Sequence, residues 1–127
     1  MTRLHHIALG ARDVEAVAAF YRDLLGLVEQ RRHLDGAGEL RSIWLELGGD
    51  ALLMVERTSA LARHVDKIGA GAFLIAVAVS VGERRALELR LEAGGYAIES
   101  RSDFTSYSRD PEGNRIAISH FPECAPP

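Results

Sequence analysis

The sequence has 127 residues, of which 47% are hydrophobic and 26% charged, and its formal net charge is −3. This profile is typical of one soluble globular domain, and the negative charge gives no electrostatic basis for binding nucleic acid or an anionic membrane surface. The longest apolar run, residues 72–79, is too short to span a bilayer. We therefore expect neither a nucleic-acid-binding protein nor a membrane protein.

The first part of the chain predicts a strand followed by a helix. Residues 4–10 alternate between two faces, with Ile7 and Leu9 on one face and His6 on the other. Residues 13–25 form an amphipathic pattern that begins at a capping aspartate and is followed by a glycine. Because this helix needs an apolar surface, we expect it to cover Ile7 and Leu9. The side chain of His6 should then face away from the helix.

Three more strands are predicted in the first half. They cover residues 27–32, 40–47 and 51–56, with a loop at 33–39 and a turn at 48–50. If the helix covers the apolar alternate residues of the middle strand, the opposite face carries Ser42, Trp44 and Glu46, on the same side as His6.

The same order of elements is predicted again in the second half. A strand over residues 73–79 precedes a helix that starts at Ser80 or Gly82 and ends at two glycines. The strands that follow are predicted at residues 96–101, 105–109 and 115–120, with a tight turn at 110–114.

The two halves match each other at a constant spacing. Leu74 lies 68 residues after His6, and Gly94 lies 68 residues after Gly26. Each half therefore reads β-α-β-β-β, and a sheet with one helix needs a second module to cover its other face. We predict a single domain over 1–127, made of a module at about 3–57, a linker with a short helix at 58–71, a module at about 72–121 and a tail at 122–127.

One cysteine is present, and no basic segment followed by an apolar stretch begins the sequence. Cys124 lies in the proline-rich tail and cannot form an internal disulfide. These observations fit a reducing compartment and argue against secretion, so we expect a cytoplasmic protein.

Three separated motifs resemble those of a known superfamily. They are His-Ile-Ala-Leu at residues 6–9, Phe-Tyr-Arg-Asp-Leu-Leu-Gly-Leu at 20–27 and Asp-Pro-Glu-Gly-Asn-Arg-Ile at 110–116. In this order they resemble the vicinal oxygen chelate superfamily, over residues 4–120. That superfamily includes glyoxalase I, bleomycin resistance proteins, extradiol dioxygenases, methylmalonyl-CoA epimerase and fosfomycin resistance enzymes.

The resemblance implies an α+β fold in which two βαβββ modules form a cup-shaped half barrel, usually in a homodimer. In the enzymes of the superfamily a divalent metal lies in the cup. A histidine and a glutamate, or variants of them, come from the first and last strands of each contributing module. The metal acts as a Lewis acid that stabilises an enediolate or a similar anion.

The residues at the implied metal positions make an incomplete set. His6 matches the first-strand histidine, although a hydrogen-bonded histidine in a cavity is an equally good interpretation. The second-module counterparts are Leu74 and Ala117, which cannot bind a metal. The remaining counterpart is Leu53 or Glu56, because a shift of one residue moves a side chain to the other face of a strand.

The best ligand set is therefore His6 with Glu56, and Glu46 is the one further carboxylate on the predicted inward side. Catalytic sites for such ions usually have three protein ligands. We predict that the metal site is incomplete, and the sequence leaves open whether the cofactor is none or a divalent metal. A metal bound there would be Ni, Zn, Mn or Fe.

Other side chains on the predicted inward side describe an apolar pocket with a few polar groups. The candidates for ligand binding are Trp44, Glu46, Leu74 and Arg115, with Tyr107 and Arg109 nearby on a face that the pattern does not settle. The alternative for Arg115 is a salt bridge at the surface or in a dimer. For the small residues Ala76 and Ala78 the alternative is close packing.

Two functions follow from these alternatives, and the sequence does not separate them. The first is a metal-independent pocket that binds a small organic molecule, in the manner of bleomycin-sequestering relatives. The second is a divalent-metal-dependent lyase, isomerase or dioxygenase that acts on a substrate with vicinal oxygens. A third possibility is an interaction module whose cup is filled by its own side chains.

Overall fold

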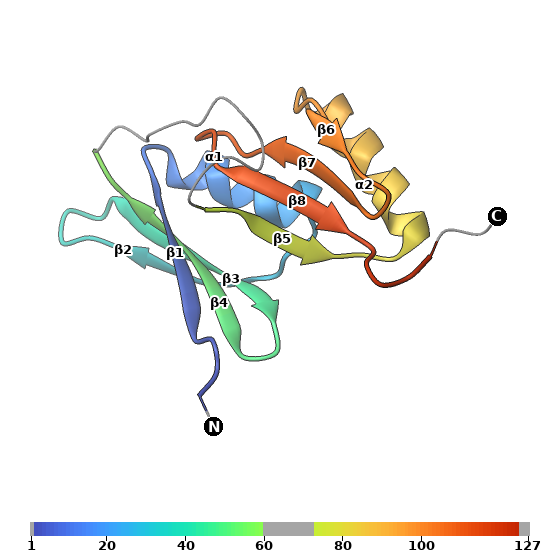
Figure 1. Cartoon of the computed structure of the whole chain (residues 1–127). Helices are drawn as coiled ribbons and strands as arrows, with labels where there is room; N and C mark the ends of the chain where they lie inside the picture. Colours follow the sequence, from blue (N-terminus) through green and yellow to red (C-terminus); the bar gives the residue numbers. More distant parts are fainter. Residues whose placement is uncertain (1, 60–72, 125–127) are drawn as a thin grey trace. The chain divides into compact units, whose positions relative to one another are not determined.

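The computed structural model describes residues 2–59 and 73–124. The chain divides into two compact units, Met1–Ala62 and Arg63–Pro127. In the described part each unit has one four-stranded sheet, and neither sheet is closed into a barrel (Figure 1). The predicted α+β class with two similar modules is confirmed. The elements are β1 (His6–Ala11), α1 (Val14–Ala19), the π-helical turn η1 (Phe20–Leu24), β2 (Glu29–Leu34), β3 (Leu40–Gly48), β4 (Ala51–Arg57), β5 (Ile75–Ala78), α2 (Val81–Ala93), β6 (Ser100–Arg101), β7 (Thr105–Arg109) and β8 (Arg115–Ser119).

The sheet of the first unit has the strand order β1-β4-β3-β2. β1 is parallel to β4, and the other pairs are antiparallel. One face of this sheet carries apolar side chains that are buried with α1, as the alternation of the strands predicts. These residues are Leu9, Ala11, Ile43, Leu45, Leu53 and Val55.

The first helix begins where the sequence predicts but does not continue as one α-helix. The Oδ1 atom of Asp13 accepts a hydrogen bond from the Ala16 amide at 3.0 Å, which caps the helix. The α-helix ends at Ala19 and continues as the wider turn η1. The consecutive aromatic side chains Phe20 and Tyr21 are both buried in this turn, with ring centroids 5.2 Å apart. Gly26 ends the segment with a φ of 81°.

The second strand is longer at its end than the sequence predicts, and His33 is therefore not in a loop. The carboxylate of Asp35 accepts hydrogen bonds from the amides of Ala37 and Glu39, at 2.9 and 3.0 Å. This side chain closes a short turn, so strand pairing continues as far as Leu34. The prediction of a loop over 33–39 is wrong for its first residues, because the turn that Asp35 closes is shorter than the predicted loop.

The sheet of the second unit has the order β5-β8-β7-β6, with β5 parallel to β8. The helix α2 lies along this sheet (Figure 1). It begins with a capping box in which the Ser80 hydroxyl accepts from the Glu83 amide at 3.1 Å and the Glu83 carboxylate accepts from the Ser80 amide at 2.7 Å. Of the two predicted starting points, Ser80 is the correct one.

Two strands of the second unit start later than predicted. β5 starts at Ile75 rather than residue 73, and only Ser100 and Arg101 of the predicted strand 96–101 are in β6. The cause of the second difference is the end of α2. The Tyr96 amide donates to the Leu91 carbonyl at 2.8 Å, so the chain first closes the helix and then joins the sheet.

The predicted linker lies almost entirely outside the described residues, as does the predicted short helix within it. In the described part of the chain, no helix is both long enough and apolar enough to cross a membrane.

A buried carboxylate joins α2 to the strands of the second sheet. Glu88 is 4% exposed, and its carboxylate accepts hydrogen bonds from the Ser106 hydroxyl at 2.8 Å and from the Arg101 guanidinium at 2.9 and 3.0 Å. Arg84 donates to the Ser106 oxygen at 2.9 Å and to the carbonyls of residues 102, 103 and 105. This network holds the loop between β6 and β7 against the helix.

The pKa of Glu88 reflects two opposing effects. Burial raises this pKa, but the hydrogen bonds from Ser106 and Arg101 and the charge of the nearby arginines outweigh burial, so the pKa lies below its ordinary value. A carboxyl group whose pKa is lower in the folded state stabilises the fold above its unfolded pKa. That stabilisation is lost as the pH falls through the lowered folded value.

We expect Glu88→Gln to lower the free energy of unfolding near neutral pH by about 1–3 kcal/mol, because charge-assisted hydrogen bonds are replaced by weaker ones. The loss of stability on acidification should also be smaller in the variant than in the wild type. Denaturant titrations at pH 7 and at several values below 5 measure both effects.

The matched control is Glu92→Gln, because the Glu92 carboxylate is exposed and 3.3 Å from the same Arg101 guanidinium. An exposed ion pair contributes about 0–1 kcal/mol, so this variant should resemble the wild type. An equal loss of stability in the two variants would contradict the role assigned to Glu88.

Candidate functional site

Each sheet has a far face, which we define as the face turned away from the helix of its own unit. On the first sheet, the strand register aligns the far-face residues in rows across neighbouring strands. The rows are His6–Leu52–Glu46, Ala8–Met54–Trp44–Arg31 and Gly10–Glu56–Ser42–His33.

The register settles the face of Glu56, which the sequence leaves open. Glu56 shares the far face with His6, but the two residues are two rows apart. Leu52 pairs with His6, and Glu56 is four residues further along β4, or about 13 Å at the rise of a strand. Since bonds from zinc-like metals to nitrogen and oxygen are about 2 Å long, the structure does not bring His6 and Glu56 to one ion.

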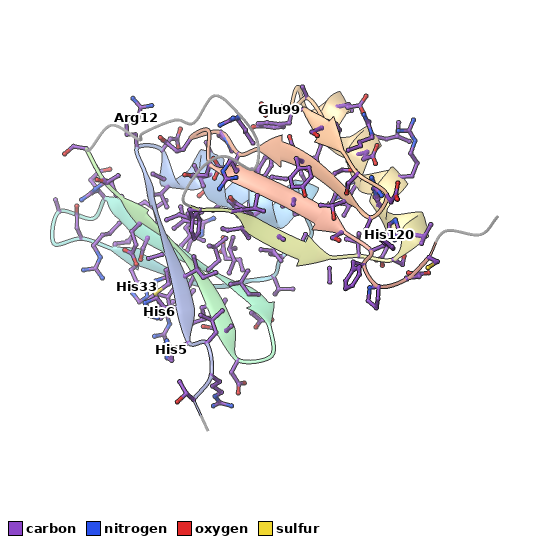
Figure 2. All side chains as sticks on the ribbon, in the orientation of Figure 1. His5, His6, Arg12, His33, Glu99 and His120 are labelled. Carbon is purple, nitrogen blue, oxygen red and sulfur yellow. The ribbon has the colours of Figure 1, made fainter. Side chains whose placement is uncertain are left out.

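The partner that the structure does bring to His6 is its neighbour. The Nδ1 atoms of His5 and His6 are 2.8 Å apart, and both side chains are exposed (Figure 2). Glu46 lies in the row of His6, but Leu52 stands between them, so their backbones are separated by about 10 Å. Among the described residues, no group of three or more histidine, cysteine, aspartate or glutamate side chains is placed to hold a metal ion.

The far face of the second sheet offers still fewer metal ligands. Its register pairs Ala76 with Ala117 and Ala78 with Ser119. On the described strands β5, β7 and β8 this face has no histidine, cysteine, aspartate or glutamate; it consists of Ala76, Ala78, Thr105, Tyr107, Arg109, Arg115, Ala117 and Ser119. The register also places Tyr107 and Arg109 on this face, which the sequence left open. The donor set of each described unit therefore does not fit a metal site with three protein ligands.

Three neighbouring polar atoms on the first far face are buried without a hydrogen-bond partner among the described residues. They are Nε2 of His33, Oγ of Ser42 and Nε1 of Trp44. His33 is directly opposite Ser42 in the register, and its ring centroid is 4.5 Å from that of Trp44. Buried polar groups are nearly always hydrogen-bonded, so this cluster is suited to a polar group of a bound molecule.

His33 is the residue of this cluster that sequence reasoning missed. It was expected in a loop, whereas it lies near the end of β2 (Figure 2). No regular alternation of residues 29–34 predicts this position, because register shifts interrupt the pairing of β2 with β3 between Glu29 and Arg31 and between His33 and Leu34. Arg32 forms ion pairs with Glu15 of α1 at 2.6 Å and with Glu29 at 2.9 Å, so it lies on the helix side, and the next residue, His33, faces the other way.

Arg115 is the most unusual side chain of the second far face. It is 4% exposed, and neither a hydrogen bond nor an ion pair joins it to a described residue. The turn before it is well fixed, because the Asp110 carboxylate accepts from the amides of Glu112 and Asn114, both at 2.9 Å. Leu74, the remaining predicted ligand-binding residue, is half-buried and lies just before β5.

A separate surface groove of about 460 Å³ lies at the C-terminal end of α2, and none of the predicted site residues lines it. It is bordered by Glu92, Gly95, Ala97, Ile98 and Arg101. Because Glu92 and Arg101 already pair with each other, we do not assign the ligand site to this groove.

The family of the chain follows from its sequence and fold. The profile of the glyoxalase/bleomycin resistance protein/dioxygenase superfamily matches residues 3–118, which is nearly the whole chain. The protein belongs to this superfamily, as the three motifs indicated. No curated protein matches the sequence.

Solved structures with the same fold come from several bacteria. A point mutant of the fosfomycin resistance protein FosX from Listeria monocytogenes, complexed with Mn(II) and 1S,2S-dihydroxypropylphosphonic acid, is 16% identical with a TM-score of 0.77 and covers 94% of this chain and 93% of its own. A glyoxalase/dioxygenase from Nostoc punctiforme is 22% identical, has a TM-score of 0.75 and covers 98% and 92%. A lactoylglutathione lyase from Agrobacterium tumefaciens is 22% identical, has a TM-score of 0.65 and covers 94% and 93%. At these identities the likeness shows the fold alone.

Two fully buried serines provide a test of the unpartnered cluster. Ser42 and Ser106 are each 1% exposed, but of the two only Ser106 has hydrogen-bond partners among the described residues. We expect Ser106→Ala to lower the free energy of unfolding by about 1–3 kcal/mol, because it removes hydrogen bonds to charged groups. Ser42→Ala should be neutral or should stabilise the ligand-free protein, because it removes a buried hydroxyl that has no partner among the described residues.

Denaturant unfolding of the two variants, measured beside the wild type without added ligand, checks this difference. A loss of stability in Ser42→Ala as large as that in Ser106→Ala would show that the Ser42 hydroxyl is already satisfied in the ligand-free protein.

Proposed function

We propose that the protein binds a small organic molecule on the far face of its first sheet, without a complete catalytic metal site. The observation that carries this proposal is the cluster of His33, Ser42 and Trp44, whose buried polar atoms lack partners among the described residues. Beside them, Met54 and Leu52 provide apolar surface. An apolar surface with a few convergent polar atoms is what a small-molecule site requires.

The same donors indicate how a ligand would be held. The indole of Trp44 is a hydrogen-bond donor, and the imidazole of His33 is a donor or an acceptor according to its tautomer. The ring of Trp44 also offers a flat apolar surface against which a ligand ring can pack. The protein would in this way bind and enclose its ligand, and no nucleophile or general base is assigned.

The alternative function is a metal-dependent lyase, isomerase or dioxygenase that acts on a substrate with vicinal oxygens. One observation favours it: His6 and Glu46 lie in the same row and on the same face, on either side of Leu52. A metal held there would act as a Lewis acid on the substrate oxygens. Residues beyond these two would have to supply the third ligand, and Glu56 is two rows away.

Metal analysis separates the two functions. In protein purified without added chelator, we expect Ni, Zn, Mn and Fe each at well below one ion per chain, and the same content in His6→Ala. One equivalent of any of these metals, lost in His6→Ala but kept in His5→Ala, would refute the metal-independent proposal.

The emission of Trp44 provides the direct test of ligand binding, since it is the one tryptophan of the sequence. A library of small organic molecules, screened by tryptophan emission and confirmed by ligand-observed NMR, should yield compounds that change the Trp44 signal. Binding of these compounds should weaken about threefold to tenfold in His33→Ala, because one hydrogen bond is lost.

His5→Ala is the matched control, because it removes an exposed histidine of the same unit that lies just before β1. If no compound changes the Trp44 signal, or if the two histidine variants weaken binding equally, the first far face is not the ligand site.

The homodimer and the cytoplasmic location stay predictions, as does the absence of nucleic-acid binding. The family resemblance is what supports a homodimer. Size-exclusion chromatography with light scattering tests it, and a mass of one chain across the accessible concentrations would exclude it.

A further inference from the structure

Arg115 is a buried cation for which the described part of the chain provides no counter-charge. Its side chain is 4% exposed, and its Nε atom is buried without a hydrogen-bond partner. The guanidinium group of arginine is always protonated in proteins and carries five donors. Since burying an unpaired charge is strongly unfavourable, buried charges are normally paired. The position of Arg115 is therefore costly in the absence of a ligand.

The other buried or half-buried arginines of the same unit are paired. Arg109 is directly opposite Arg115 in the register, and it donates to the Glu99 carboxylate at 2.9 Å and to the Gly113 carbonyl at 3.2 Å. Arg84 is likewise bound by the Ser106 hydroxyl and by three carbonyl groups. Of the described arginines of the second unit, Arg115 is the one for which no partner is found.

The surroundings of Arg115 on the far face favour an anionic partner from outside the chain. The described residues of this face on β5, β7 and β8 include no acidic side chain. Next to Arg115 are the small side chain of Ala117, two residues along β8, and Ala76, which pairs with Ala117. Both alanines are small and uncharged, Ala117 is itself buried, and Tyr107 on the neighbouring strand is half-buried, so none of these three residues neutralises the charge of Arg115.

We propose that Arg115 binds the anionic group, a carboxylate or a phosphate-type group, of a small organic molecule on the far face of the second sheet. This inference rests on the proposed function, because it takes small organic molecules as the ligands of this chain, and it narrows those bound at the second sheet to organic anions. A planar guanidinium group matches these anions with two parallel hydrogen bonds, which are shorter and stronger than bonds between neutral groups. Arg115 is then a specificity residue, and binding supplies the counter-charge that the described chain does not.

The first experiment uses stability and inorganic phosphate, so it does not depend on knowing the organic ligand. In ligand-free protein, Arg115→Met should raise the melting temperature by about 2–8 °C, because a methionine fills similar space without a buried charge. Phosphate should raise the melting temperature of the wild type more than chloride does at equal ionic strength. It should have no such additional effect on Arg115→Met or Arg115→Gln.

The matched control is Arg109→Gln, which removes the same charge from the position opposite Arg115. Because Arg109 is paired with Glu99, this variant should lower the melting temperature and keep the response to phosphate. A lower melting temperature in both Arg115 variants, or an equal loss of the phosphate response in Arg109→Gln, would overturn the proposal. Circular dichroism shows whether each variant is folded. If neither Arg115→Met nor Arg115→Gln folds, Arg115→Lys, which keeps the positive charge, is measured in their place.

The second experiment identifies the anionic group with ligands of one shape. Benzoate, phenylphosphonate and neutral benzamide share the same ring and are titrated by isothermal calorimetry or ligand-observed NMR. We expect at least one of the two anions to bind more tightly than benzamide to the wild type. That preference should fall by roughly tenfold to a hundredfold in Arg115→Met. Whichever anion binds more tightly distinguishes a carboxylate ligand from a phosphate-type ligand.

The two experiments also separate this inference from the proposed function. If benzamide and both anions bind equally, the protein binds small organic molecules and the role of Arg115 is refuted. If phosphate acts through Arg115 but no aromatic probe or library compound binds, the anion site at Arg115 is supported and the binding of a small organic molecule is refuted. If neither phosphate nor either aromatic anion acts through Arg115, the inference is refuted whatever the library shows.

Discussion

The packing within each unit depends on one constraint, which is that side chains alternate along the strands of a sheet that is covered by a helix on one face. Burial of Leu9, Ile43, Leu45, Leu53 and Val55 on the helix side fixes the register of the first sheet. The next residue along each strand must then face the other way. The positions of His6, Trp44 and Glu56 are a consequence of this apolar packing. No local feature of these three residues determines which way they face. The apolar core on one face of the sheet therefore determines which side chains are presented on the far face.

In the second unit, the layer between the helix and its sheet contains more polar side chains. The helix side of its sheet includes Ser106 and Ser108, and α2 places Glu88 over them. Such a layer is stable only when each polar atom has a partner, as the Glu88 network does. The far faces of the two sheets differ from this helix-side layer, because several buried polar atoms on the far faces have no partner among the described residues. This contrast within one chain is the reason to regard the far faces as binding surfaces.

Much of the fold could be predicted from the sequence, because periodicity and capping residues are local signals. The Asp13 cap, the start of α2 near Ser80 and the face of His6 all follow from such signals. The errors lie where side chains act over several residues, as when Asp35 shortens a loop and thereby moves His33 into a strand. The distance between His6 and Glu56 and the lack of partners for Arg115 among the described residues depend on packing in three dimensions. No pattern in the sequence contains that information.

In each module the first strand lies beside the last one, with β1 next to β4 and β5 next to β8. All the ladder hydrogen bonds of a sheet are therefore made within one continuous half of the chain. A cut in the backbone between β4 and β5 would break none of the strand pairings described in either sheet. Each continuous half of the chain therefore contains a complete sheet together with the helix that covers it.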